Sequence, residues 1–394
     1  MSPTPNVSEG HAPETLEELI RTRHVLVVVG AGGAGKTTTT AALGVAAAQR
    51  GRRVLCLTID PAKRLAQSLG LEQMTTAEQA ISPEIFRNAG LSMRGSLTAM
   101  MLDPRATFDE LIMKYSSTRE RAEKLLNNKL YKYVSTSLAG TQEYMAMEKL
   151  VAVRGDARFD LILLDTPPTA NALDFLDAPQ RLIEALDSAT MRWFVQAFES
   201  TGKLSMNLLA RSAAVILRGI GRITGVGFLQ SMAELIAELN DLFGGFKERA
   251  KMVEAALRSS EVSFVLVSSP APMSIQEVLF FSDRLEQARM PRGAFVVNRF
   301  RLPAPGSPVP PTELDAARAL ARRGISLGED GSARVLLAYR DAQRLAELDA
   351  LHVRGLYERA RGNVPIVSVP ELPADVHDLP SLAALADVLV GKSA

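Results

Sequence analysis

The chain has 394 residues, of which 23% are charged and 47% hydrophobic, and its 45 Lys and Arg nearly balance its 44 Asp and Glu for a formal charge of +1. This composition is typical of a globular protein, and it provides no basic surplus for binding nucleic acid or an anionic membrane. The one cysteine, Cys56, excludes an intrachain disulfide and a Cys-x-x-Cys metal site. No apolar run is long enough to predict a transmembrane helix or a secretory signal, so we expect a cytoplasmic protein without stable membrane insertion.

Short apolar runs alternate with long helical patterns along the chain. The polar residues 1–14 are expected to form a flexible N-terminus, followed by one domain over 15–394. The expected strands are Val25–Val29, Val54–Thr58, Leu97–Leu102, Leu161–Leu164, Val262–Val267, Ala294–Val297 and Pro365–Val369. The main expected helices are Lys36–Arg50, Pro104–Tyr115, Thr118–Asn128, Thr141–Val153, Ser231–Arg258, Ser274–Ala288 and Ala333–Ala360. This alternation predicts an α/β fold with a doubly wound, mostly parallel sheet.

Two long helical insertions interrupt the alternation, at about 104–155 and 175–258. We expect them to form a helical subdomain on the sheet rather than a separate core. The second insertion is rich in apolar residues over Trp193–Phe198 and Leu204–Leu229. Its glycines weaken a helix, which suits a movable lid over a hydrophobic groove, although plain core or a dimer interface explains the same pattern.

The first expected strand leads into Gly30-Ala-Gly-Gly-Ala-Gly-Lys36-Thr37, which matches the phosphate-loop pattern G-x-x-x-x-G-K-[ST]. Glycines let backbone N–H groups turn inward around phosphate oxygens, and the following helix directs its positive end at the same anion. Lys36 would neutralise the β- and γ-phosphates, and the Thr37 hydroxyl suits Mg²⁺. The candidate nucleotide-binding residues here are Gly30, Gly32, Gly33, Ala34, Gly35, Lys36, Thr37 and Thr38. A purely structural glycine turn is the competing interpretation.

Two aspartates follow expected strands, Asp60 after the second and Asp165 after the fourth. The carboxyl ends of parallel strands share one edge of the sheet, where the phosphate loop also lies. Asp165 is therefore a candidate to hold Mg²⁺ through water, and Asp60 is a candidate to orient or deprotonate the attacking water. Helix capping or a turn is the alternative role for an Asp before Pro.

The segments GAGGAGKTTT, TIDPAKRLAQSLG, DTPPTANALDFL, VVNRF and PELPADVHDL occur in the order found in the ArsA family. The chain resembles that family, which includes the arsenite-pump ATPase and the guided-entry ATPase that targets tail-anchored membrane proteins. The resemblance implies an ATPase that uses ATP and Mg²⁺, with Lys36 and Asp60 as catalytic residues. It further implies that Asn298 reads the purine, and that Pro370 and Leu372 lie in the loop flanking the adenine.

The sequence departs from the family pattern at three points. The family's first phosphate-loop Lys, which reaches the partner's nucleotide across a dimer, is Ala31 here, and Lys63 and Arg64 are candidate substitutes. The Cys-x-x-Cys motif that clasps the family's homodimer through zinc is absent. Because Cys56 stands alone in an apolar strand, it is expected to be a core residue, and a cysteine-lined metalloid site is not expected.

These features lead to a main hypothesis and two alternatives. The main one is a nucleotide-gated dimeric ATPase that handles an apolar client, such as a membrane-protein segment. Ala31 suggests an alternative, a nucleotide-binding regulatory subunit that forms a heterodimer with a paralogue supplying the missing Lys. A partitioning ATPase of the MinD or ParA kind is less favoured, because the C-terminal tail lacks a basic amphipathic helix.

Overall fold

The computed structural model describes residues 14–59, 64–128, 131, 141–166, 177–178, 184, 248–303, 311–328, 330–360 and 364–391. Its centre is an eight-stranded sheet in the order β3-β4-β2-β5-β1-β6-β7-β8. All neighbouring strands are parallel except β3, which pairs antiparallel with β4 at one edge. The predicted α/β architecture with a doubly wound, mostly parallel sheet is therefore confirmed.

The expected strands all form, with ends that differ by one or a few residues. The strands are β1 Val25–Gly30, β2 Arg53–Thr58, β3 Gln79–Ala80, β4 Ser96–Met101, β5 Leu161–Asp165, β6 Val262–Ser268, β7 Arg292–Phe300 and β8 Ile366–Pro370. The antiparallel strand β3 was not expected, because a strand of two residues carries no recognisable periodicity.

Eleven helices have defined bounds in the described part of the chain. They are α1 Leu16–Thr22, α2 Lys36–Gln49, α3 Arg64–Ser68, α4 Pro83–Asn88, α5 Pro104–Tyr115, α6 Arg119–Asn127, α8 Thr141–Arg154, α13 Pro272–Gln287, α14 Glu313–Arg322, α15 Gly331–Arg359 and α16 Leu379–Leu389. Residues 248–257 are also helical. Several of the helices begin at a residue whose side chain caps the first turn, for example Asp103 at α5 and Asp378 at α16.

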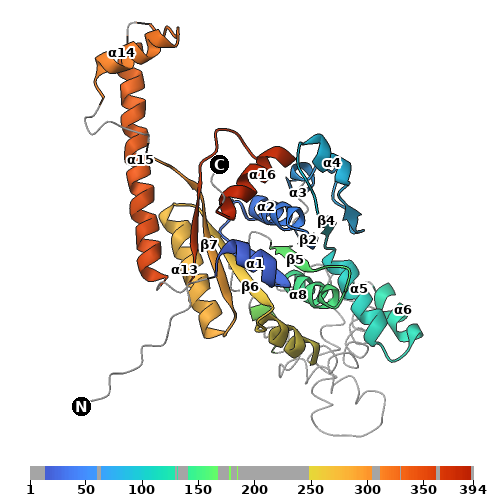
Figure 1. The fold of residues 1–394 in the computed structure, drawn as a ribbon. Coiled ribbons are helices and arrows are strands. Elements are labelled where there is room, and N and C mark those ends of the chain that lie inside the picture. The colour runs from blue at the N-terminus through green and yellow to red at the C-terminus, as the bar shows by residue number, and fades with distance from the viewer. Residues whose placement is uncertain are drawn as a thin grey trace, which may run out of the picture.

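Alternate residues of each strand point to opposite faces of the sheet, and each face is covered by helices. On one face, Leu26 and Cys56 belong to an apolar cluster with α1, α2 and α16. On the other face, Val27 and Leu55 pack with residues of α8, α13 and α15 and of the helical residues 248–257. Figure 1 shows these two layers, with α2 and α16 side by side on one of them. Strands buried on both faces explain why their sequences are continuously apolar.

A third apolar cluster involves the helices that lie between β4 and β5 in the chain. It joins Phe108 and Ile112 of α5, Leu125 of α6 and Tyr144 of α8. The described part of the insertion at 104–155 is thus helical and has apolar contacts of its own. Most of the insertion at 175–258, with Trp193–Phe198 and Leu204–Leu229, lies outside the described residues, as do residues 1–13.

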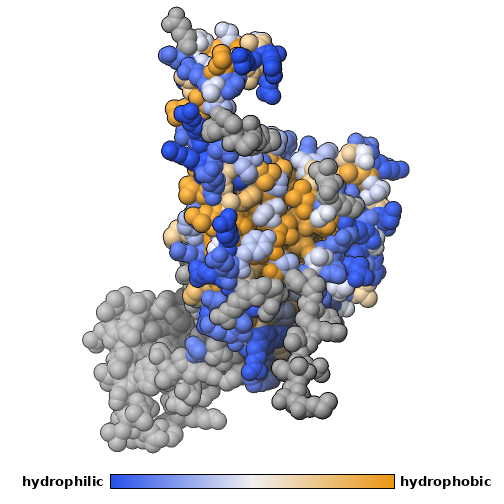
Figure 2. All heavy atoms as spheres, turned by 60° about the vertical axis from the view of Figure 1, so that its left-hand side comes forward, coloured by the Kyte–Doolittle hydropathy of each residue, from blue (hydrophilic) through white to orange (hydrophobic). Residues whose placement is uncertain are grey.

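The helix α15 is 29 residues long and carries α14 away from the body of the molecule (Figure 1). Figure 2, which turns this side forward, shows apolar side chains gathered on the surface of the body below the projecting end. Exposed leucines on α15 include Leu337, Leu348 and Leu351. Among the described helices, none is both long and apolar enough to cross a bilayer.

Candidate functional site

The loop between β1 and α2 has the backbone of a phosphate loop. Gly30, Gly33 and Gly35 have φ values of 149°, 71° and 99°, which glycine adopts far more readily than other residues. A Cβ atom on Gly30 would lie 1.9 Å from the carbonyl oxygen of Val267 in the adjacent strand β6. Glycine is therefore needed at position 30 both for its φ and for the close approach of β6. Gly32 and Gly33 are exposed on the loop.

Lys36 is only 6% exposed, and its ammonium group lies inside the loop. Its Nζ donates to the carbonyl oxygens of Gly30 at 2.9 Å and Ala31 at 3.1 Å. These contacts keep a positive charge at the centre of the loop, where the N-terminus of α2 also presents backbone N–H groups. Both features favour the same ligand, an anion such as a phosphate group.

Thr37 and Asp165 meet at the carboxyl edge of the sheet. The Thr37 hydroxyl donates to Asp165 Oδ2 at 2.8 Å, and the Thr58 hydroxyl at the end of β2 donates to the same oxygen at 3.1 Å. Asp165 ends β5 and is fully buried. One carboxylate and one hydroxyl beside a phosphate loop are oxygen donors suited to Mg²⁺, which takes few protein ligands and completes its shell with phosphates and water.

No group of three or more His, Cys, Asp or Glu side chains able to hold a metal occurs among the described residues. A metal site built wholly from such side chains is therefore not found in that part of the chain. The Thr37–Asp165 pair does not conflict with this finding, because a magnesium site of the nucleotide-dependent kind needs only one or two protein oxygens.

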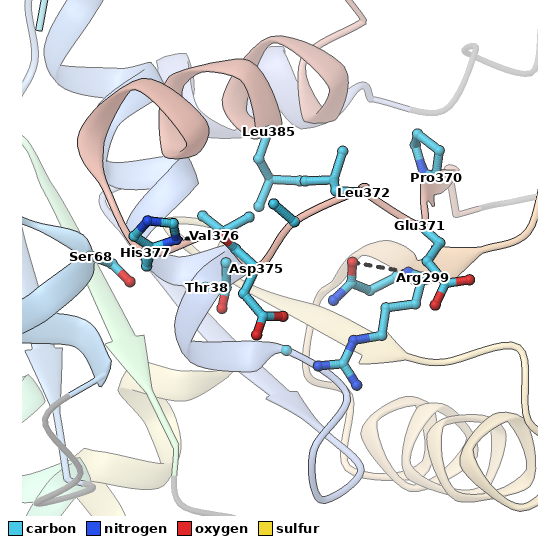
Figure 3. A pocket seen from close by; sticks show the side chains of 13 residues that line it. Thr38, Ser68, Arg299, Pro370, Glu371, Leu372, Asp375, Val376, His377 and Leu385 are labelled. Atoms are coloured by element: carbon cyan, nitrogen blue, oxygen red, sulfur yellow. Dashed lines mark hydrogen bonds between the residues drawn. The ribbon is translucent and has the colours of Figure 1, made fainter. Parts of the chain in front are cut away.

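A cavity of about 430 Å³ opens beside the phosphate loop. Its wall is formed by residues from α2, the end of β7 and the segment from β8 into α16, as Figure 3 shows. The lining residues are Gly35, Thr38, Ser68, Asn298, Arg299, Pro370, Glu371, Leu372, Ala374, Asp375, Val376, His377 and Leu385. Segments separated by more than 300 residues in sequence therefore meet at one cavity. Its lining includes Thr38, Asn298, Pro370 and Leu372, which are candidate nucleotide-binding residues from the sequence.

Asn298 connects the cavity directly to the phosphate loop. Its Nδ2 donates to the Ala34 carbonyl oxygen at 2.9 Å. A Cβ atom on Gly35 would lie 2.2 Å from the same Nδ2, so the glycine also permits this close contact. The amide keeps a second N–H and a further oxygen lone pair, so it can still bind the edge of a base.

Several lining residues were not singled out from the sequence. Arg299, Asp375 and His377 lie on the cavity wall, and Leu385 of α16 covers part of it. Two of the three polar ones occur within the quoted segment PELPADVHDL, and Arg299 occurs within VVNRF. The backbone path at the end of β7 and after β8 brings these residues to the cavity, and no periodicity in the sequence indicates that path.

Other predicted positions divide into those that the structure describes and those that it does not. Asp60 and Lys63 lie outside the described residues, as do the side chain of Arg64 and residues 167–176 after Asp165. Ala31 has no charged group, and it is 7% exposed and belongs to the apolar cluster beside α2. Cys56 is fully buried in the same cluster, and burial, followed by the charge of Asp165, raises the pKa of its thiol to about 12. The expectation that Cys56 is a core residue is confirmed.

Comparison with known proteins gives one family and several relatives. The family described as anion-transporting ATPase, the ArsA family, matches residues 23–308. ATPase GET3 of Malassezia globosa is 25% identical over 311 residues, which cover 78% of this chain and 82% of that protein. ATPase GET3 of Chaetomium globosum is 26% identical over 321 residues, or 81% and 84% of the two chains. ATPase get3 of Schizosaccharomyces japonicus is 23% identical over 380 residues, which cover 96% of each chain.

Proposed function

Because the chain belongs to the ArsA family of anion-transporting ATPases, we propose that it binds ATP with Mg²⁺ between the phosphate loop and the cavity beside it, and hydrolyses it there. The observation that carries the proposal is the bond from Asn298 to Ala34, which joins the cavity to the loop. A triphosphate on the loop would direct its base toward Asn298, Pro370 and Leu372. A cavity of this size suits a nucleoside.

Each residue of the loop has a distinct role in this proposal. Backbone N–H groups from Gly30 to Thr38 would surround the phosphate oxygens, as the glycine conformations allow. Lys36 would exchange its present carbonyl partners for the β- and γ-phosphates. Thr37, with Asp165 behind water, would hold Mg²⁺, which supplies positive charge to the phosphates when bound.

We propose that Asp60, which follows β2 in the sequence, orients the attacking water. This role comes from the resemblance of the segment TIDPAK to the first switch of the family. The carboxylate would align the water with the γ-phosphorus and accept its proton.

Ala31 leaves one charge to be supplied from elsewhere. In the family, the Lys at this position acts on the nucleotide of the partner in a dimer, whereas Ala31 is a small apolar residue in the core. We propose that the protein works as a dimer, with itself or with a paralogue that carries this Lys, and that dimer closure follows nucleotide binding. Loss of a trans-acting cation lowers turnover by about 10³-fold or more in comparable phosphoryl transfer.

We further propose an apolar client, such as a membrane-protein segment, for the insertion at 175–258. The apolar residues of Trp193–Phe198 and Leu204–Leu229 and the resemblance to the guided-entry ATPase support this class of client. Closing of the dimer would then change the surface that the insertion offers to the client.

The test is ATP turnover by the purified chain, with ATP binding followed by calorimetry and molar mass by light scattering. Asp60→Asn should abolish turnover while it retains ATP binding, and Ala31→Lys should raise turnover if the chain alone lacks the cation. Vigorous turnover that is unchanged by Ala31→Lys would mean that this chain supplies the charge from another residue. A chain that binds no ATP, alone or with a Lys-bearing partner, would contradict the proposal.

A further inference from the structure

Two residues other than glycine have a left-handed backbone in the described part of the chain, Arg289 with φ 57° and Arg299 with φ 60°. Such conformations are strained for arginine and persist only where the surroundings enforce them. Arg289 directly follows the last turn of α13. Its N–H donates to Glu286 O at 3.0 Å and the next N–H, of Met290, donates to Leu285 O at 2.8 Å. These are the bonds of a normal helix terminus, so the conformation of Arg289 is explained.

Arg299 has no such explanation, because it lies inside β7, where no helix ends. The pairing of β7 with β8 shifts register between Val297 and Phe300, so the strand is kinked at this position. Irregularities of this kind change the direction of a side chain and are frequent beside functional sites. The strained residue thus lies at the point where β7 meets the cavity.

Contacts on both sides of the kink hold this backbone in place. The Arg299 N–H donates to Asn298 Oδ1 at 3.0 Å, and Asn298 Nδ2 is bonded in turn to the phosphate loop at Ala34. On the other side, the Phe300 carbonyl oxygen accepts from the Glu371 N–H at 2.9 Å. The conformation of Arg299 is therefore coupled to the loop and to the wall of the cavity.

The guanidinium group of Arg299 points across the cavity toward Asp375 and the phosphate loop, as Figure 3 shows. The side chain is exposed at the rim, and it forms no ion pair or hydrogen bond with any residue in the ranges that the structure describes. Nearby Arg301 differs, since it pairs with Asp349 at 3.3 Å and with Glu371 at 3.4 Å. The apolar side chains of Leu372 and Val376 line the same cavity.

We propose that Arg299 is a further nucleotide-binding residue, whose planar guanidinium stacks on the base while Asn298 meets the edge of the base. The inference rests on the nucleotide site proposed above and adds a specificity-determining residue to it. A guanidinium stacks well on a flat ring, whereas a lysine ammonium, which has no plane, does not replace it. The strain at position 299 is then the structural cost of directing this group over the base.

The test compares ADP with inorganic tripolyphosphate, which has no base, by calorimetry on the full chain. Arg299→Asn should weaken ADP binding about tenfold, the size expected of a stacking contact, and leave tripolyphosphate binding unchanged. Arg299→Lys should weaken ADP binding nearly as much, since it keeps the charge but not the plane. Arg289→Asn is the matched control, because it changes the other left-handed arginine away from the cavity, and it should leave both affinities unchanged.

Thermal unfolding of the ligand-free variants separates a binding effect from a folding effect. Asparagine tolerates the left-handed conformation, so neither Asn variant should have a lower melting temperature than the parent chain. Unchanged ADP affinity in Arg299→Asn would overturn the inference. An equal loss of affinity for ADP and tripolyphosphate would also overturn it, because it would mean that Arg299 contacts the phosphates and not the base. Failure of the parent chain to bind ADP would instead remove the proposed site itself.

Discussion

The hydroxyl of Thr37 lies 2.8 Å from Oδ2 of Asp165 and donates a hydrogen bond to it, although 128 residues separate them in sequence. The first residue belongs to the helix after β1 and the second to the end of β5, the strand beside β1. Parallel pairing of these strands, Val28 opposite Asp165, brings the two oxygens to the same edge. The pair is thus a consequence of strand register and can be tested as a unit.

Asp165→Asn removes the negative charge and keeps an oxygen that can accept the Thr37 hydroxyl. We expect ATP turnover to fall by about 100-fold or more, because the water molecules around the proposed Mg²⁺ would lose the carboxylate that holds them. ADP affinity measured in excess chelator should change by less than about threefold, since the phosphate contacts do not depend on this charge.

The control for this variant is Thr58→Val, which removes the second donor to Asp165 and leaves the carboxylate. It should cost about 1 kcal/mol of unfolding free energy with a much smaller loss of turnover. If Asp165→Asn keeps full magnesium-dependent turnover, Asp165 has a structural role only.

Gly30→Ala tests the close approach of the phosphate loop to β6. The added methyl group would lie 1.9 Å from the Val267 carbonyl oxygen, so one of two central strands must move. We expect the unfolding free energy from urea titration to fall by about 3 kcal/mol or more. Gly32→Ala is the matched control, because a Cβ atom there meets nothing within 4 Å, and it should change stability by less than about 0.5 kcal/mol. Equal stabilities of the two variants would disprove the packing argument.

Many residues of this candidate site could be predicted from the sequence, because the sheet is parallel. A loop of the form G-x-x-x-x-G-K-T fixes the phosphate end, and any polar residue that ends a parallel strand reaches the same edge. Asp165 could therefore be selected before its position in space was known, whereas Asn298 was selected from the resemblance of the segment VVNRF to the family. The buried Cys56 could be assigned to the core because it lies in a continuously apolar strand.

Other features depend on backbone geometry that a sequence pattern does not encode. The φ of Arg299 arises from the register shift between β7 and β8, and nothing in VVNRF indicates a kink. Likewise, α16 packs on α2 and so places Leu385 at the cavity, a contact between elements more than 300 residues apart. The two-residue strand β3 pairs with the edge of β4 that β2 leaves free.

The ion pair between Arg53 and Asp160 joins the amino ends of β2 and β5. The Arg53 guanidinium and backbone N–H both bind the carboxylate and lower the pKa of Asp160 to about 2. A depressed pKa in the folded state means that the carboxylate stabilises the fold above its unfolded pKa of about 4 and stops doing so as the pH falls from about 4 toward 2. Because the pair is partly exposed and screened by water, we expect it to contribute about 1 kcal/mol to the free energy of unfolding at neutral pH.

Urea unfolding at pH 7 and at pH 3 measures this contribution. Asp160→Asn should be less stable than the parent chain at pH 7, and the difference should shrink at pH 3. Adding Arg53→Gln to Asp160→Asn should cost little more, because the pair is already broken. A stability difference that is the same at both pH values would contradict the assigned cause.

The final prediction concerns the thiol of Cys56. Burial of this thiol raises its pKa to about 12. Only the thiolate reacts with disulfide reagents, so at pH 8 the folded protein has almost no reactive form, and access is blocked as well. The sequence contains one cysteine, and any labelling therefore reports on Cys56 alone. We expect an aromatic disulfide reagent to label the protein rapidly in concentrated guanidinium, and under native conditions only at the rate at which the fold opens. ADP should slow native labelling further, because a ligand that binds only the folded state lowers the population of open molecules. Labelling of the folded protein as fast as the unfolded one would show that β2 is accessible to the reagent.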